Sequence, residues 1–129
     1  MIDISEQANS VRKQANAEIN LIKSDLKKMR GELVNFFIEG NIQNLLKLIE
    51  KTKYMTYDLG RKSYLSPSSL KVMIMNTVVD STKQQKYFKL SKRLLGIYSE
   101  VARLQYLKLP LEGTHKNALQ QTFDEIIST

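Results

Sequence analysis

The chain has 129 residues, a formal net charge of +7 and no cysteine. Without cysteine, disulfide frameworks, thiol catalysis and cysteine-based zinc sites are excluded. The size fits one domain with its own core, and the 42% hydrophobic content is ordinary for a globular protein. The N-terminus shows no signal-peptide pattern, and no apolar run approaches the roughly 20 residues of a membrane span. We therefore expect a cytoplasmic protein that does not engage a membrane.

The spacing of apolar residues predicts an all-α protein, a single small bundle of about five helices over residues 1–129. The first predicted helix covers residues 5–38, with residues 1–20 as an N-terminal extension. Its strongest feature is a heptad seam, a coiled-coil-like pattern of two core positions with charged flanks. The seam consists of Ile19, Ile22, Leu26, Met29, Leu33 and Phe36. It is short, which favours packing inside a bundle.

Gly40 and Asn41 interrupt the seam, and a second helix is predicted over residues 42–59. Its inward residues are expected to be Ile42, Leu45, Leu46 and Ile49. Gly60 follows at the position of a left-handed C-terminal cap, because glycine tolerates positive φ.

Ser66 and Pro67 form a helix start signal for a third helix that reaches residue 80. Its apolar face carries Leu70, Met73, Ile74, Thr77 and Val78. A fourth helix is predicted over residues 83–108, before Pro110. A turn at residues 111–113 leads to a fifth helix, residues 114–127, in a C-terminal extension that covers residues 111–129. This last helix should bury Leu119, Phe123, Ile126 and Ile127.

Positive charge is concentrated in the fourth predicted helix. Residues 83–108 hold seven basic residues and one acid, so they contribute +6 of the total +7. The same segment carries Tyr87, Phe88, Tyr98 and Tyr106. One interpretation is an ordinary solvated face. The other is a strip that follows the phosphates of a nucleic acid, with strong salt dependence and little sequence specificity.

A second basic cluster lies in and after the second predicted helix. It consists of Lys47, Lys51, Lys53, Arg61 and Lys62. Arg61 and Lys62 follow the predicted helix end, where positive charge also favours the helix dipole. That effect alone could account for them, so the cluster has both a structural and a binding interpretation.

Little in the sequence indicates catalysis. His115 is the only histidine, and it follows a turn with no recognisable catalytic partner. Metal ligands at fixed spacing and a glycine-rich phosphate loop are both missing from the sequence. We therefore expect a protein that is not an enzyme and uses no cofactor or metal.

Three segments together resemble the small subunit of type III-A CRISPR effector complexes. The first is Ser-Asp-Leu-Lys-Lys-Met-Arg at residues 24–30, and the second is Tyr-Asp-Leu-Gly-Arg-Lys at residues 57–62. The third comprises residues 70–80 and the basic, aromatic stretch of residues 86–106. The order and spacing of these segments carry the resemblance, which covers about residues 24–108.

The resemblance implies a non-catalytic helical subunit that stacks in several copies along the guide-RNA-bearing backbone and grips target RNA. Its expected partners are guide RNA, target RNA, the backbone and large subunits, and further copies of itself. RNA contacts are expected mainly from Arg61, Lys62, Lys86, Lys89 and Arg93. Two residues of the second basic cluster, Lys51 and Lys53, complete the candidate set.

An alternative hypothesis from a different class remains open. The chain could be a helical interaction or scaffold protein of phage or mobile-element origin that acts through the heptad seam. A stable coiled-coil dimer without RNA affinity would favour that alternative.

Overall fold

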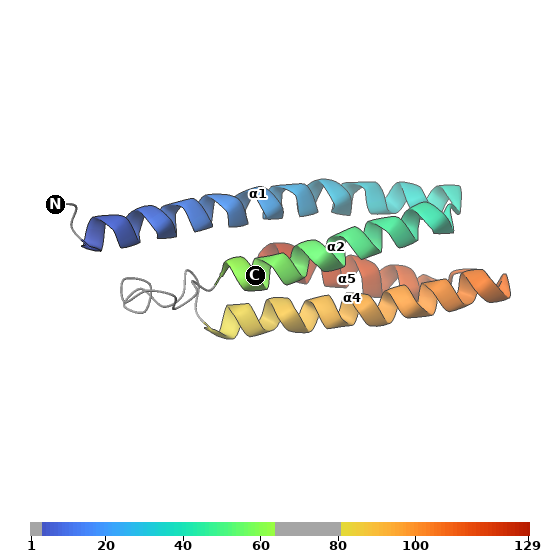
Figure 1. Cartoon of the computed structure of the whole chain (residues 1–129). Coiled ribbons are helices and arrows are strands. Elements are labelled where there is room, and N and C mark those ends of the chain that lie inside the picture. The colour runs from blue at the N-terminus through green and yellow to red at the C-terminus, as the bar shows by residue number, and fades with distance from the viewer. Residues whose placement is uncertain (1–3, 64–80) are drawn as a thin grey trace.

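The computed structural model describes residues 4–63 and 81–129. Within these ranges the helices are α1 (Ile4–Glu39), α2 (Ile42–Lys62), α4 (Ser81–Leu107) and α5 (Gly113–Ser128), and no strand occurs there (Figure 1). The prediction of an all-α protein is confirmed. Four of the predicted helices are observed, each within three residues of its expected ends. The remaining one, over residues 67–80, lies outside the described residues.

The four described helices form a bundle in which each helix packs mainly against two others. α1 packs against α2 and α5, and α4 packs against the same two helices, so α1 and α4 are diagonal. The N-terminal turns of α1 run past the end of α2 (Figure 1). Ala15 is accordingly the first residue of α1 that is buried among those described.

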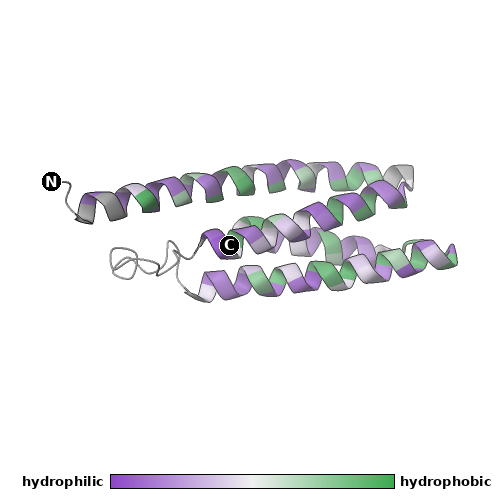
Figure 2. Ribbon diagram, viewed as in Figure 1, coloured by the Kyte–Doolittle hydropathy of each residue, from purple (hydrophilic) through white to green (hydrophobic). Residues whose placement is uncertain are grey.

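The heptad seam is confirmed as the core-facing side of α1. Ile19, Leu26, Met29 and Leu33 are buried, and Ile22 and Phe36 pack partly buried against them. Figure 2 shows apolar residues recurring between polar ones along each helix, as expected when one side of every helix is buried. The seam is thus used inside the chain, and a dimer through it would require the bundle to open.

The prediction that Gly60 caps α2 is wrong. The helix continues to Lys62, and Ser63 follows in a right-handed conformation with its N–H bonded to the Leu59 carbonyl at 3.0 Å. Gly60 lies inside the helix, directly under the ring of Phe88 from α4. A Cβ at this position would lie 2.7 Å from Phe88 Cζ and 2.8 Å from Cδ1. The glycine therefore permits close approach of α2 and α4 and has no need for a positive φ.

The helix ends follow local capping rules at two other positions. Gly40 has φ of +68°, and the Asn41 side chain accepts a hydrogen bond from the Asn44 N–H at 3.2 Å, which confirms the predicted break between α1 and α2. At the end of α4, Lys108 has φ of +57° although it is not glycine. Its N–H bonds the Gln105 carbonyl at 3.1 Å in a Schellman-type end to α4.

The predicted fifth helix is an integral member of the bundle. Leu119, Phe123 and Ile126 of α5 are fully buried in the core, while Ile127 is only partly buried. The helix starts one residue before its expected position, at Gly113.

Candidate nucleic-acid interface

The basic residues of α4 lie on the side of the helix that faces away from the core. Tyr87, Leu90 and Leu94 point inward and are buried. Every lysine and arginine between residues 86 and 103 is exposed: Lys86, Lys89, Lys92, Arg93 and Arg103. The basic residues of α4 are therefore separated from its buried apolar side.

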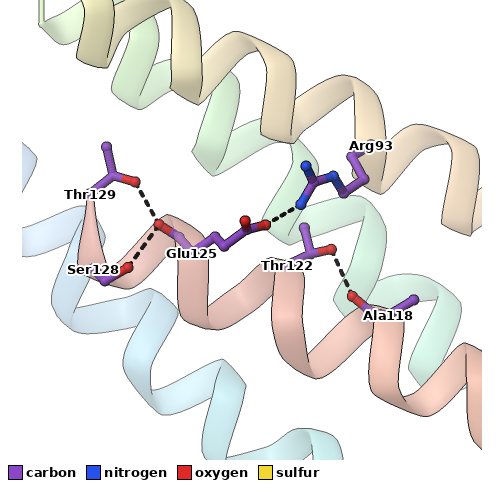
Figure 3. A network of polar contacts seen from close by, with 6 residues as sticks. All are labelled: Arg93, Ala118, Thr122, Glu125, Ser128 and Thr129. Atoms are coloured by element: carbon purple, nitrogen blue, oxygen red, sulfur yellow. Dashed lines mark hydrogen bonds and ion pairs between the residues drawn. The ribbon is translucent and has the colours of Figure 1, made fainter.

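Two of these cations are neutralised within the fold. Arg93 forms an ion pair with Glu125 of α5, next to the Ser128 and Thr129 hydroxyls that donate to the Glu125 carbonyl (Figure 3). Arg103 pairs with Glu100 at 2.7 Å, and its hydrogen bond holds the pKa of that carboxyl below its ordinary value. The predicted contact residue Arg93 thus connects α4 to α5.

Three lysines of α4 make no ion pair with any residue that the structure describes. We call Lys86, Lys89 and Lys92 the lysine row. Successive members are three residues apart, so each step rises by about 4.5 Å along the helix. Lys86 lies two turns before Arg93, on the α5 side, and the row crosses the exposed surface toward α2. Lys92 is not among the seven RNA-contact residues predicted from the sequence.

The residues of the second basic cluster, on α2, do not form one continuous positive surface. Arg61 is paired with Asp58 one turn earlier, and their hydrogen bond raises the Arg61 pKa. Lys62 is paired with Glu18 of α1 at 2.9 Å. Both cations are therefore compensated by acids from the same molecule.

Lys51 and Lys53 lie on opposite sides of α2. Lys51 lines a hollow of about 480 Å³ against α1, which also contains Asp25 and Glu32. Lys53 faces α4. Of the seven predicted RNA-contact residues, Lys86 and Lys89 belong to the lysine row. Lys53 lies near the Lys92 end of that row.

A groove of about 630 Å³ separates the exposed edges of α2 and α4. Its lining consists of Lys53, Tyr54, Tyr57, Phe88, Ser91, Lys92 and Leu95. We call it the aromatic groove. Tyr54 and Tyr57 are 62% and 52% exposed. The rings of Tyr57 and Phe88 are 5.3 Å apart and tilted by 53°.

The rim of the aromatic groove is cationic. The Lys53 Nζ lies 4.7 Å from the Tyr54 ring centroid and 5.8 Å from that of Tyr98. Lys92 supplies the second positive charge, and no carboxylate is among the described residues that line the groove. The Ser91 hydroxyl is bonded to the Lys53 carbonyl at 3.0 Å and so connects α4 to α2 at the base of the groove.

The His115 side chain caps the start of α5. Its Nδ1 accepts a hydrogen bond from the Glu112 N–H at 3.1 Å at the start of α5, and its Nε2 lies 3.8 Å from Glu100. Among the described residues, no group of three histidines or acids could hold a metal ion. That the protein is not an enzyme stays a prediction.

No helix in the described ranges has the length and apolar character needed to cross a membrane. Comparisons of the chain with protein-family models, with curated proteins and with solved structures find no match.

Proposed function

We propose that this protein is a non-catalytic RNA-binding and assembly subunit of a CRISPR effector complex. In this role several copies stack along the guide-RNA backbone, beside the backbone and large subunits, and hold target RNA by its phosphates. Base pairing with the guide supplies the sequence specificity, so the subunit needs no base-reading module. The resemblance of residues 24–108 to small subunits of type III-A complexes suggests this setting.

The observation that supports RNA binding best is the lysine row. Arg93 and Arg103 form ion pairs with acids of the same chain. Lys86, Lys89 and Lys92, in contrast, are exposed and form no ion pair with a described residue. Contact with phosphates would release condensed counterions at each lysine. A row of lysines without ion pairs, on a helix whose other side is buried in the core, suits a strand that is bound through its phosphates and not through its bases.

The alternative role as a scaffold that acts through the heptad seam has less support. Leu26 and Leu33 are completely buried against the other helices. A partner that used the seam would have to displace helices of the same chain.

The test is the salt dependence of RNA binding by the full chain. Titration of a single-stranded RNA at several salt concentrations gives the slope of log affinity against log salt. Replacing all three residues of the lysine row with alanine should reduce that slope by about 2, at roughly 0.7 per lost phosphate contact on a single strand.

A matched control removes the same charge elsewhere. Lys13, Lys27 and Lys28 are exposed lysines on α1. Their triple alanine variant should keep nearly the wild-type slope. Equal slopes for both triple variants would refute the assignment of the lysine row, and absence of RNA binding by the wild-type chain would refute the proposed function.

A further inference from the structure

The two exposed tyrosines of α2 stand between two hollows. On one side is the aromatic groove, and on the other is a hollow of about 360 Å³ lined by Tyr54, Met55, Tyr57, Asp58 and Arg61. Both tyrosines are more than half exposed as whole residues, so each can offer aromatic surface to a ligand. Aromatic rings with accessible faces are the usual platforms on which single-stranded nucleic acids stack their bases.

The charges around these rings favour an anionic ligand. Lys53 and Lys92 stand at the rim of the aromatic groove. The acid of the adjoining hollow, Asp58, is already paired with Arg61. A ligand that is flat and apolar on its faces but carries negative charge at its edge fits this combination, and a nucleotide has that chemistry.

Lys92 belongs both to the lysine row and to the lining of the aromatic groove. A strand whose phosphates follow Lys86, Lys89 and Lys92 therefore arrives at the mouth of the groove. The next base along the strand can then turn toward Tyr54 and Tyr57 while its phosphate stays near Lys92. The groove and the row form one continuous path across α4 to α2.

We infer that the aromatic groove takes an unpaired base of the bound RNA, stacked on Tyr54 or Tyr57, while the lysine row holds the adjoining phosphates. This inference rests on the proposed function and adds a base-stacking site to it. With such a site, the affinity for RNA depends on the presence of a base but not on which base it is, since every base has an apolar face.

The test compares two probes of equal charge with the full chain. One is a short oligoadenylate, and the other is an abasic ribose-phosphate oligomer of the same length. At fixed salt, the wild type should bind the oligoadenylate about tenfold more tightly, the size expected for one stacked base. The double variant Tyr54→Leu, Tyr57→Leu should lose that preference while keeping the wild-type salt slope.

Two controls separate stacking from folding. The double variant Tyr54→Phe, Tyr57→Phe keeps the rings and should keep the preference for the oligoadenylate. Tyr106 is 87% exposed on α4 and does not line the groove. Tyr106→Leu should therefore bind both probes like the wild type. Thermal melting of each variant reports whether the bundle is intact.

The outcomes distinguish the two proposals. Binding of both probes with equal affinity, or RNA binding that the leucine variant leaves unchanged, overturns the base site and leaves the RNA-binding function standing. If the wild type binds neither probe, the proposed function itself is overturned.

Discussion

Replacing Gly60 with alanine places one methyl group of α2 against the Phe88 ring of α4. The new Cβ would lie 2.7 Å from Phe88 Cζ, well inside the van der Waals distance of two carbons. Forcing an extra carbon into such a contact costs about 1–3 kcal/mol. Alanine in place of glycine inside a helix returns about 1 kcal/mol of that. The expected net loss of stability is therefore about 1 kcal/mol.

Gly96 provides the matched control, because it lies inside α4, is exposed, and has open space where a Cβ would stand, with no atom within 4 Å. Gly96→Ala should stabilise the protein by about 0.5–1 kcal/mol from helix propensity alone. The two glycine variants should thus differ by about 2 kcal/mol, with opposite signs. Chemical denaturation monitored by circular dichroism measures both free energies of unfolding.

A double variant tests the cause. Phe88→Leu removes the ring atoms that meet the new methyl group. Gly60→Ala should then cost nothing, or stabilise, when it is introduced into the Phe88→Leu background, because only the propensity gain is left. Stabilisation of similar size by Gly60→Ala and Gly96→Ala in the wild-type background would refute the close-packing role of Gly60.

Three further outcomes are expected. Lys108→Gly should raise stability by about 1 kcal/mol in thermal melts, since Lys108 holds a left-handed conformation that costs L-residues roughly this amount; an unchanged or lower melting temperature would contradict this. Tyr87→Phe should not lower stability, because the buried Tyr87 hydroxyl has no hydrogen-bond partner among the described residues; a marked loss would mean that the hydroxyl is satisfied. Arg103 lowers the pKa of Glu100, so the contribution of this carboxylate is present above its ordinary pKa and is lost as the pH falls through the lowered value. The difference in melting temperature between wild type and Glu100→Gln should therefore vanish at acidic pH, and a difference that persists there would contradict the pairing.

Much of the fold was predictable because it depends on local spacing. The heptad seam of α1 identifies the buried residues Leu26 and Leu33, since residues seven apart share one face of a helix. Gly40 and Asn41 mark the break between α1 and α2 through their own backbone and side-chain preferences. The wet basic side of α4 follows from the same periodicity.

The candidate site was predictable only in part. The sequence alone determined that positive charge gathers on one side of α4, but not which cations stay uncompensated. Glu125 neutralises Arg93 from another helix, and Glu18 does the same for Lys62, so these pairs exist only after the bundle has formed.

The role of Gly60 and the aromatic groove were likewise decided by the tertiary structure. Both depend on where α4 crosses α2, which places Phe88 over Gly60 and Lys92 opposite Tyr54 and Tyr57. The sequence determined the helices and their buried faces because these arise from residues a few positions apart. The contacts between helices determined the uncompensated lysines and the groove, because residues distant in the chain meet only when the apolar faces pack.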